Sequence, residues 1–165
     1  MLSFLSPIIT KENPLTVEHS IRTAVAAVVS LLIAREIGLA EFYWAAILTI
    51  VVMQSTLGAT LPVSAQRFAG TILGAGVGAL AGTWFPGNVF VFGLCIVTLG
   101  ILCAPFRLER NAYRYAGITL AIIMLVPGHT GVKVAIHRFF EVCVGIVAGL
   151  AISALWPERS RPSKV

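Results

Sequence analysis

Charged residues inside apolar stretches are the first candidates for chemistry in this chain. Arg67 and Arg138 each stand before Phe at the start of an apolar run, and Glu141 follows Arg138 by one helical turn. Charged groups in membrane-spanning helices are costly, so they often mark substrate pathways or ion partners. Both arginines are therefore candidates for a pathway, with helix-end anchoring as the alternative. For Glu141 the spacing predicts an ion pair with Arg138, and proton coupling is the other interpretation.

Five further residues join this candidate pathway. Arg22 lies near the start of the first apolar run, where it either lines the pathway or extends to the membrane surface. Gln54 and Ser55 lie past the middle of the second run and either contact substrate or bond to a neighbouring helix. Tyr43 and Trp44 offer aromatic surfaces for stacking.

The segment GTILGAGVGALAG, residues 70–82, raises the question of a dinucleotide site. Its glycines fit the loose pattern G-x-G-x-x-G/A, which needs a preceding strand and an acidic residue about 20 positions later. The preceding residues indicate a loop and a span start, and the next acidic residue is Glu109. At a spacing of four, Gly70, Gly74, Gly78 and Gly82 instead form one helix face. Such a face lets another membrane helix approach closely.

The sequence contains no motif for catalysis or for cofactor or metal binding. There is no nucleophile–base pairing, phosphate-binding loop or zinc-protease motif, so we expect no enzyme activity and no cofactor. Cys95, Cys103 and Cys143 lack metal-ligand spacing and indicate apolar packing, so no metal site is expected.

The composition indicates an integral membrane protein. Of the 165 residues, 58% are hydrophobic and 12% charged, whereas about 25% are charged in typical soluble domains. The net charge of +5 is scattered between apolar runs, which encodes membrane topology and argues against nucleic acid as a partner. We expect membrane lipid as the surroundings.

Six apolar segments are long enough to be candidate spans. They are 21–37, 42–61, 68–85, 89–106, 113–126 and 138–156, separated by turn signals such as Gly38, Pro62 and Pro127. With six spans, both termini lie on one side of the membrane. That side then holds nine cations, namely Lys11, Arg22, Arg67, Arg107, Arg110, Arg114, Arg159, Arg161 and Lys164. The other side holds three, namely Arg35, Lys133 and Arg138. This bias places both termini in the cytoplasm.

The third and sixth spans resemble each other at an offset of 71 residues. Residues 67–86 align without gaps on 138–157, and Arg67, Phe68, Gly74, Gly78 and Pro86 meet Arg138, Phe139, Gly145, Gly149 and Pro157. Gly145 and Gly149 repeat the glycine face. Three spans per repeat require opposite orientations of the two halves, as in many transporters. The alternative is a chance likeness of two glycine-bearing helices.

The second and fifth spans are interrupted at equivalent places, in MQSTLGATLP (53–62) and MLVPGHTG (124–131). Both are either broken helices that face a cavity or plain loop entrances.

These segments resemble the fusaric-acid-resistance-like (FUSC) proteins, which overlap the aromatic acid exporters and the integral membrane bound transporter domain. The likeness covers about residues 18–157 and is most specific in YWAAILTIVVMQSTLGATL and QRFAGTILGAGVGAL. The family pattern falls on Arg22, Tyr43, Trp44, Ala45, Gln54, Gly58, Gln66, Arg67, Gly70, Thr71, Gly74, Gly78, Arg138, Gly145 and Pro157. The resemblance implies a bacterial inner-membrane protein for efflux of aromatic carboxylates or related toxic compounds, with distant anion-conducting relatives in plants.

The expected organisation is an all-α, multi-pass protein with two inverted three-helix repeats, about 19–87 and 88–157, between short cytoplasmic segments, 1–18 and 158–165. We expect it to export small organic anions by an ion or proton gradient. A passive anion channel and a non-transporting membrane subunit are the alternatives. Many members of the resembled family carry two such halves, so the single half favours a homodimer or another oligomer.

Overall fold

The computed structural model describes residues 17–54, 56–105, 109–126 and 131–157, and this part of the chain is entirely helical apart from turns and short connections. The six helices are α1 (Val17–Glu36), α2 (Tyr43–Val52), α3 (Leu57–Trp84), α4 (Val89–Cys103), α5 (Arg110–Leu125) and α6 (Gly131–Leu155). The expected all-α class is confirmed. By length and composition, α1 and α6 are the two helices of the described chain that are clear candidates to cross a membrane.

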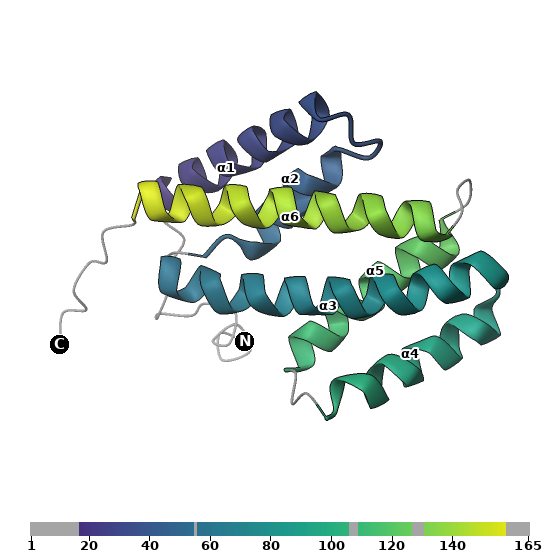
Figure 1. Cartoon of the computed structure of the whole chain (residues 1–165). Coiled ribbons are helices and arrows are strands. Elements are labelled where there is room, and N and C mark those ends of the chain that lie inside the picture. Colours follow the sequence, from purple (N-terminus) through teal and green to yellow (C-terminus); the bar gives the residue numbers. More distant parts are fainter. Residues whose placement is uncertain (1–16, 55, 106–108, 127–130, 158–165) are drawn as a thin grey trace, which may run out of the picture.

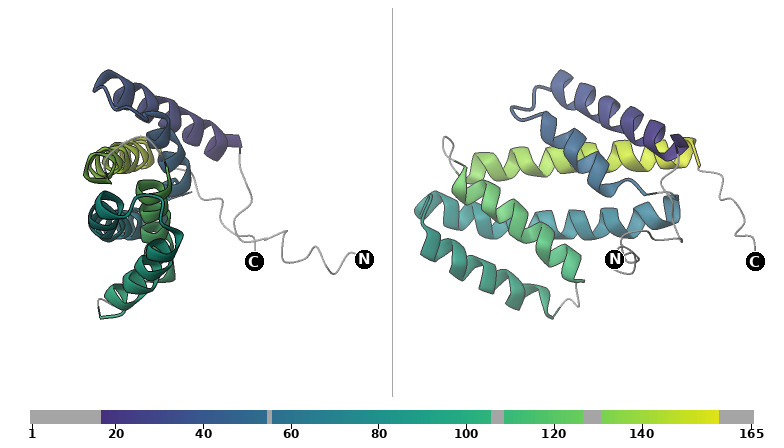
Figure 2. Two further views of the ribbon diagram at one scale, coloured as in Figure 1. Left: turned by 90° about the vertical axis from the view of Figure 1, so that its right-hand side faces the viewer. Right: turned by 180° about the vertical axis from the view of Figure 1, so that it is seen from behind.

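The long helices α3 and α6 lie side by side and run in opposite directions (Figure 1). The short helices α2 and α5 cross behind them, while α1 and α4 form the two outer edges (Figure 2). The contacts are reciprocal: α6 packs on α1 and α2, and α3 packs on α4 and α5. The centre of the bundle is therefore built from the two helices that carry the candidate arginines.

Local signals at the helix ends explain several boundaries. Gly38 follows α1 with a φ of +76°, and Leu39 N–H donates to the Ala34 carbonyl at 3.0 Å, which is the usual glycine-terminated helix end. At the start of α4, the Asn88 side chain accepts hydrogen bonds from the N–H groups of Phe90 and Val91. The turns after α1 and before α4 thus reverse the chain within a few residues.

The expected second span, residues 42–61, is wrong in its second half. The helix ends at Val52, Met53 is extended, and α3 begins at Leu57. Thr56 caps α3 by accepting a hydrogen bond from the Ala59 N–H, so a new helix starts there. Pro62, expected as a break, lies inside α3.

The expected third and sixth spans also begin too late. α3 starts ahead of residue 68 and α6 ahead of residue 138, so both helices extend beyond the arginines that were expected to open them. At 3.6 residues per turn, Arg67 lies about three turns into α3 and Arg138 about two turns into α6. Neither arginine is at a helix end, so helix-end anchoring is wrong for both.

The glycine face of α3 lies directly against α5. A Cβ atom added at Gly70 or Gly74 would come within 2.4 Å or 2.3 Å of the carbonyl oxygen of Ala112 or Ala116, respectively. Further along the face, Gly78 and Gly82 lie against Ile123. The backbones of α3 and α5 therefore approach each other as closely as glycine allows.

The same packing recurs between α6 and α2. An added Cβ at Gly145 would lie 2.8 Å from the Ala45 carbonyl oxygen, and one at Gly149 would lie 3.9 Å from the Thr49 methyl group. Thr49 Oγ1 also donates to the Gly145 carbonyl at 3.1 Å. Each long helix thus meets the short helix behind it through glycine.

Candidate functional site

Arg138 is the centre of a buried charged cluster. Its guanidinium forms ion pairs with Glu41, which precedes α2, and with Glu141, one turn further along α6, the latter at 3.1 Å. The predicted pair of Arg138 with Glu141 is thus confirmed. The guanidinium carbon also lies 4.3 Å from the centre of the Trp44 ring, within the range of a cation–π contact. Arg138 is 4% exposed, so these groups replace water around its charge.

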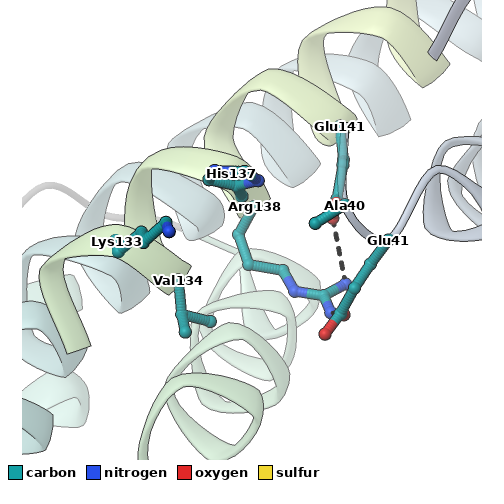
Figure 3. A pocket seen from close by; sticks show the side chains of 7 residues that line it. All are labelled: Ala40, Glu41, Lys133, Val134, His137, Arg138 and Glu141. Carbon is teal, nitrogen blue, oxygen red and sulfur yellow. Dashed lines mark hydrogen bonds and ion pairs between the residues drawn. The ribbon is translucent and has the colours of Figure 1, made fainter. Parts of the chain in front are cut away.

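A cavity of about 80 Å³ adjoins this cluster. Figure 3 shows Arg138 extending from α6 toward Glu41, with Glu141 directed at the same guanidinium. The walls come from α6 and from the segment between α1 and α2, and consist of Ala40, Glu41, Lys133, Val134, His137, Arg138 and Glu141. The cavity therefore connects the buried ion pairs with the exposed side chain of Lys133.

Arg67 is buried and has no carboxylate partner in the part of the chain that the structure describes. It is 5% exposed, its guanidinium carbon lies 4.7 Å from the centre of the Tyr115 ring, and its Nε has no hydrogen-bond partner. Within the described residues it forms no ion pair. A buried charge without a partner is expensive, so this position is suited to an anion that supplies the missing charge.

The two arginine environments correspond at the offset of 71 residues. Arg67 on Tyr115 matches Arg138 on Trp44, and the rings of Phe68 and Phe139, the residues that follow the arginines, lie 5.7 Å apart. The sequence offset thus relates tertiary contacts as well as residue types. The environments differ in charge, because among the described residues carboxylates lie beside Arg138 and not beside Arg67.

Of the remaining candidates, Tyr43 lies at the edge of the Arg138 cluster and Gln54 lies apart from both clusters. Tyr43 is half exposed, its ring contacts Phe42 and Trp44, and it is close enough to Arg138 to interact with its charge. Gln54 is partly buried, and its backbone N–H donates to Thr60 Oγ1 at 3.2 Å. Ser55 lies outside the described residues.

Arg22 is fully buried in the second turn of α1. Its side chain therefore does not extend to the surface of the bundle, as the second alternative for this residue required.

Two residues of these clusters were missed by the sequence reasoning. Glu41 is 97 residues from Arg138 along the chain, and Tyr115 lies in α5, far from Arg67 in α3. The offset of 71 residues that pairs Arg67 with Arg138 also pairs Trp44 with Tyr115, so that offset was the signal for the tyrosine. For Glu41 the only signal is an acidic residue beside an apolar run.

The thiols and the possible metal ligands add no further site. Cys95 and Cys103 are buried in the helix packing, and Cys143 is partly buried. Among the described residues, no group of three His, Cys or acidic side chains is placed to hold a metal ion.

Buried arginines within apolar helices are typical of membrane-embedded proteins that handle charged compounds. The chain belongs to the fusaric acid resistance protein-like family, whose sequence profile matches residues 14–152. This is a family of inner-membrane proteins of the transporter type and not of enzymes.

The curated relatives are longer than this chain. The inner membrane protein YeeA of Escherichia coli is 27% identical over 147 residues, which cover 86% of this chain and 41% of YeeA. The inner membrane protein YccS of the same organism is 27% identical, covering 85% of this chain and 20% of YccS. An uncharacterized protein of Haemophilus influenzae is 28% identical, with 90% of this chain and 21% of that protein covered. No solved structure matches significantly.

Proposed function

We propose that this protein exports small organic anions, such as aromatic carboxylates, across the bacterial inner membrane, driven by an ion or proton gradient. The observation that carries the proposal is the buried guanidinium of Arg67, which has an aromatic ring on one side and no carboxylate partner among the described residues. A substrate carboxylate would supply that charge.

The chemistry of this position favours a planar anion. A guanidinium donates two parallel hydrogen bonds to a carboxylate, and such charge-assisted bonds are among the strongest in proteins. The Tyr115 ring beside the guanidinium offers a face on which an aromatic substrate can stack. An aromatic carboxylate combines both features in one small molecule.

We also propose that the chain crosses the membrane six times as two inverted repeats, with both termini in the cytoplasm. The reciprocal packing of α3 on α5 and of α6 on α2 supports a twofold relation between the halves. The ten residues of α2 rise only about 15 Å, about half of the ~30 Å hydrocarbon core. In this arrangement α2 is a broken helix, tolerated because α1 and α6 cover it.

A second copy of the chain is the proposed partner. The chain matches about two fifths of YeeA and about one fifth of YccS, so the relatives contain much more protein than this membrane unit. Homodimerisation would give two membrane units in one assembly.

Transport by the purified protein in liposomes tests the proposal. Radiolabelled benzoate, a simple aromatic carboxylate, is measured with and without an imposed proton gradient. Flux that depends on the gradient supports the exporter. Gradient-independent anion current identifies a channel, and no flux for benzoate or related anions identifies a non-transporting subunit. Empty liposomes and a heat-inactivated sample are the controls.

A further inference from the structure

We propose that Glu41, Arg138 and Glu141 form a proton-binding site, in which two carboxylates share one guanidinium and one proton. Binding of the proton is independent of the substrate. Only its coupling to anion export rests on the proposed function.

The charge balance of the cluster carries the inference. Both carboxylates pair with Arg138, so the three groups together hold one surplus negative charge when both carboxylates are ionised. Glu141 is fully buried, and apart from its ion pair with Arg138 no side chain of the described residues forms a hydrogen bond with its oxygens. Burying an uncompensated charge costs several kcal/mol. A proton on one carboxylate removes the surplus, as in other carboxylate pairs that share a site.

The surrounding cations form no ion pair with the two carboxylates within the described residues. Lys133 and His137 on α6 line the cavity without pairing with Glu41 or Glu141. On α3, the nearest charge is that of Arg67, which lies over the Tyr115 ring and is close enough to Arg138 for the two cations to repel each other.

The remaining elements around the cluster are α1 and α2. Tyr43 at the start of α2 lies close enough to Arg138 to interact with its charge and is half exposed, and the charged residues at the end of α1, Arg35 and Glu36, are exposed. Among the described residues, no cation on these two helices forms an ion pair with Glu41 or Glu141.

The cavity gives protons a route to the buried carboxylate. Its volume of about 80 Å³ exceeds the roughly 10–15 Å³ that one water molecule needs, and the polar side chains among its mostly apolar walls offer partners for water. Glu41 is 28% exposed, whereas Glu141 is 0% exposed. The pair therefore links a carboxylate that solvent reaches with one that it does not.

The equivalent position in the first half of the chain has no room for such a site. At the offset of 71 residues, Glu141 corresponds to Gly70, where an added Cβ would come within 2.4 Å of the Ala112 carbonyl oxygen. A glutamate at position 70 would collide with α5. The proton site is therefore confined to the second half, and Arg67 in the first half has no carboxylate beside it among the described residues.

Infrared difference spectroscopy between acidic and neutral pH tests the site in the full chain in liposomes without substrate. The wild type should show the carbonyl band of a shielded, protonated carboxylic acid, equivalent to about one proton per chain. Glu141→Gln and Glu41→Gln should each abolish the band, because the remaining carboxylate is neutralised by Arg138. Glu109→Gln is the matched control, since this exposed glutamate bonds to Gln66, and it should retain the band.

Three results would overturn the proposal: no such band in the wild type, a band that persists in both variants, or a titration that shifts with Na⁺ concentration, which would assign a metal cation. If Glu141→Gln does not fold, Glu41→Gln decides alone, because Glu41 is partly exposed and easily substituted. A negative result in this test would not change the expected benzoate transport. Each of the two proposals can therefore be refuted without the other.

Discussion

Substitution of Gly74 by alanine tests the close approach of α3 and α5. The added Cβ would lie 2.3 Å from the Ala116 carbonyl oxygen, whereas ordinary contact begins at 3.4 Å. The two backbones must therefore separate by about 1 Å, and overpacking of this kind costs about 1–3 kcal/mol. Gly76, on the same helix, has nothing within 4 Å of an added Cβ, so Gly76→Ala should gain up to about 1 kcal/mol from helix propensity.

The measurement is the free energy of unfolding of the purified protein in mixed micelles with increasing sodium dodecyl sulfate, followed by circular dichroism. Gly74→Ala should be less stable than Gly76→Ala by about 1–3 kcal/mol, because the gain in helix propensity is common to both variants. A second pair repeats the comparison on α6: Gly145→Ala meets the Ala45 carbonyl at 2.8 Å, while Gly93 on α4 has open space. Equal stability within each pair would refute close backbone packing at the glycines.

Three further predictions concern topology and packing. A periplasmic reporter fused after Gly87 should be active and one fused after Glu109 inactive, and the reverse pattern would contradict the inverted repeats. Trp44→Leu should cost up to about 2 kcal/mol of unfolding free energy through loss of the face on which Arg138 lies, whereas Trp44→Phe should cost less. Thr49→Val removes the hydrogen bond to the α6 backbone at nearly equal side-chain volume. The free energy of unfolding should fall by about 0.5–2 kcal/mol in the same assay, and a loss outside that range would argue against the bond.

The number and class of the helices in the described chain could be predicted from the sequence, because apolar runs separated by glycine and proline indicate separate helices. The helix boundaries could not. Pro62 was interpreted as a break, but the Thr56 cap starts a helix ahead of it, so the proline costs only local hydrogen bonding near that end of α3. Capping by a threonine was the stronger signal.

Only part of the candidate site could be predicted from the sequence. Two arginines at a fixed offset could be found, and so could the partner of Arg138 one turn away on α6. The contacts of Arg138 with Glu41 and of Arg67 with Tyr115 depend on how α2 and α5 cross behind the long helices. Crossing geometry is a property of packing between helices, and no local pattern encodes it.

The most direct test of the account is the benzoate flux of Arg67→Gln in liposomes, beside Arg67→Lys and a matched control at the exposed Arg114. If Arg67 binds the anion, Gln should abolish gradient-driven flux and Lys should restore part of it, because Lys keeps the charge but not the planar pair of donors. Arg114→Gln should transport normally, and all variants should be folded by circular dichroism. Wild-type flux in folded Arg67→Gln would contradict the central claim that this buried guanidinium binds the transported anion.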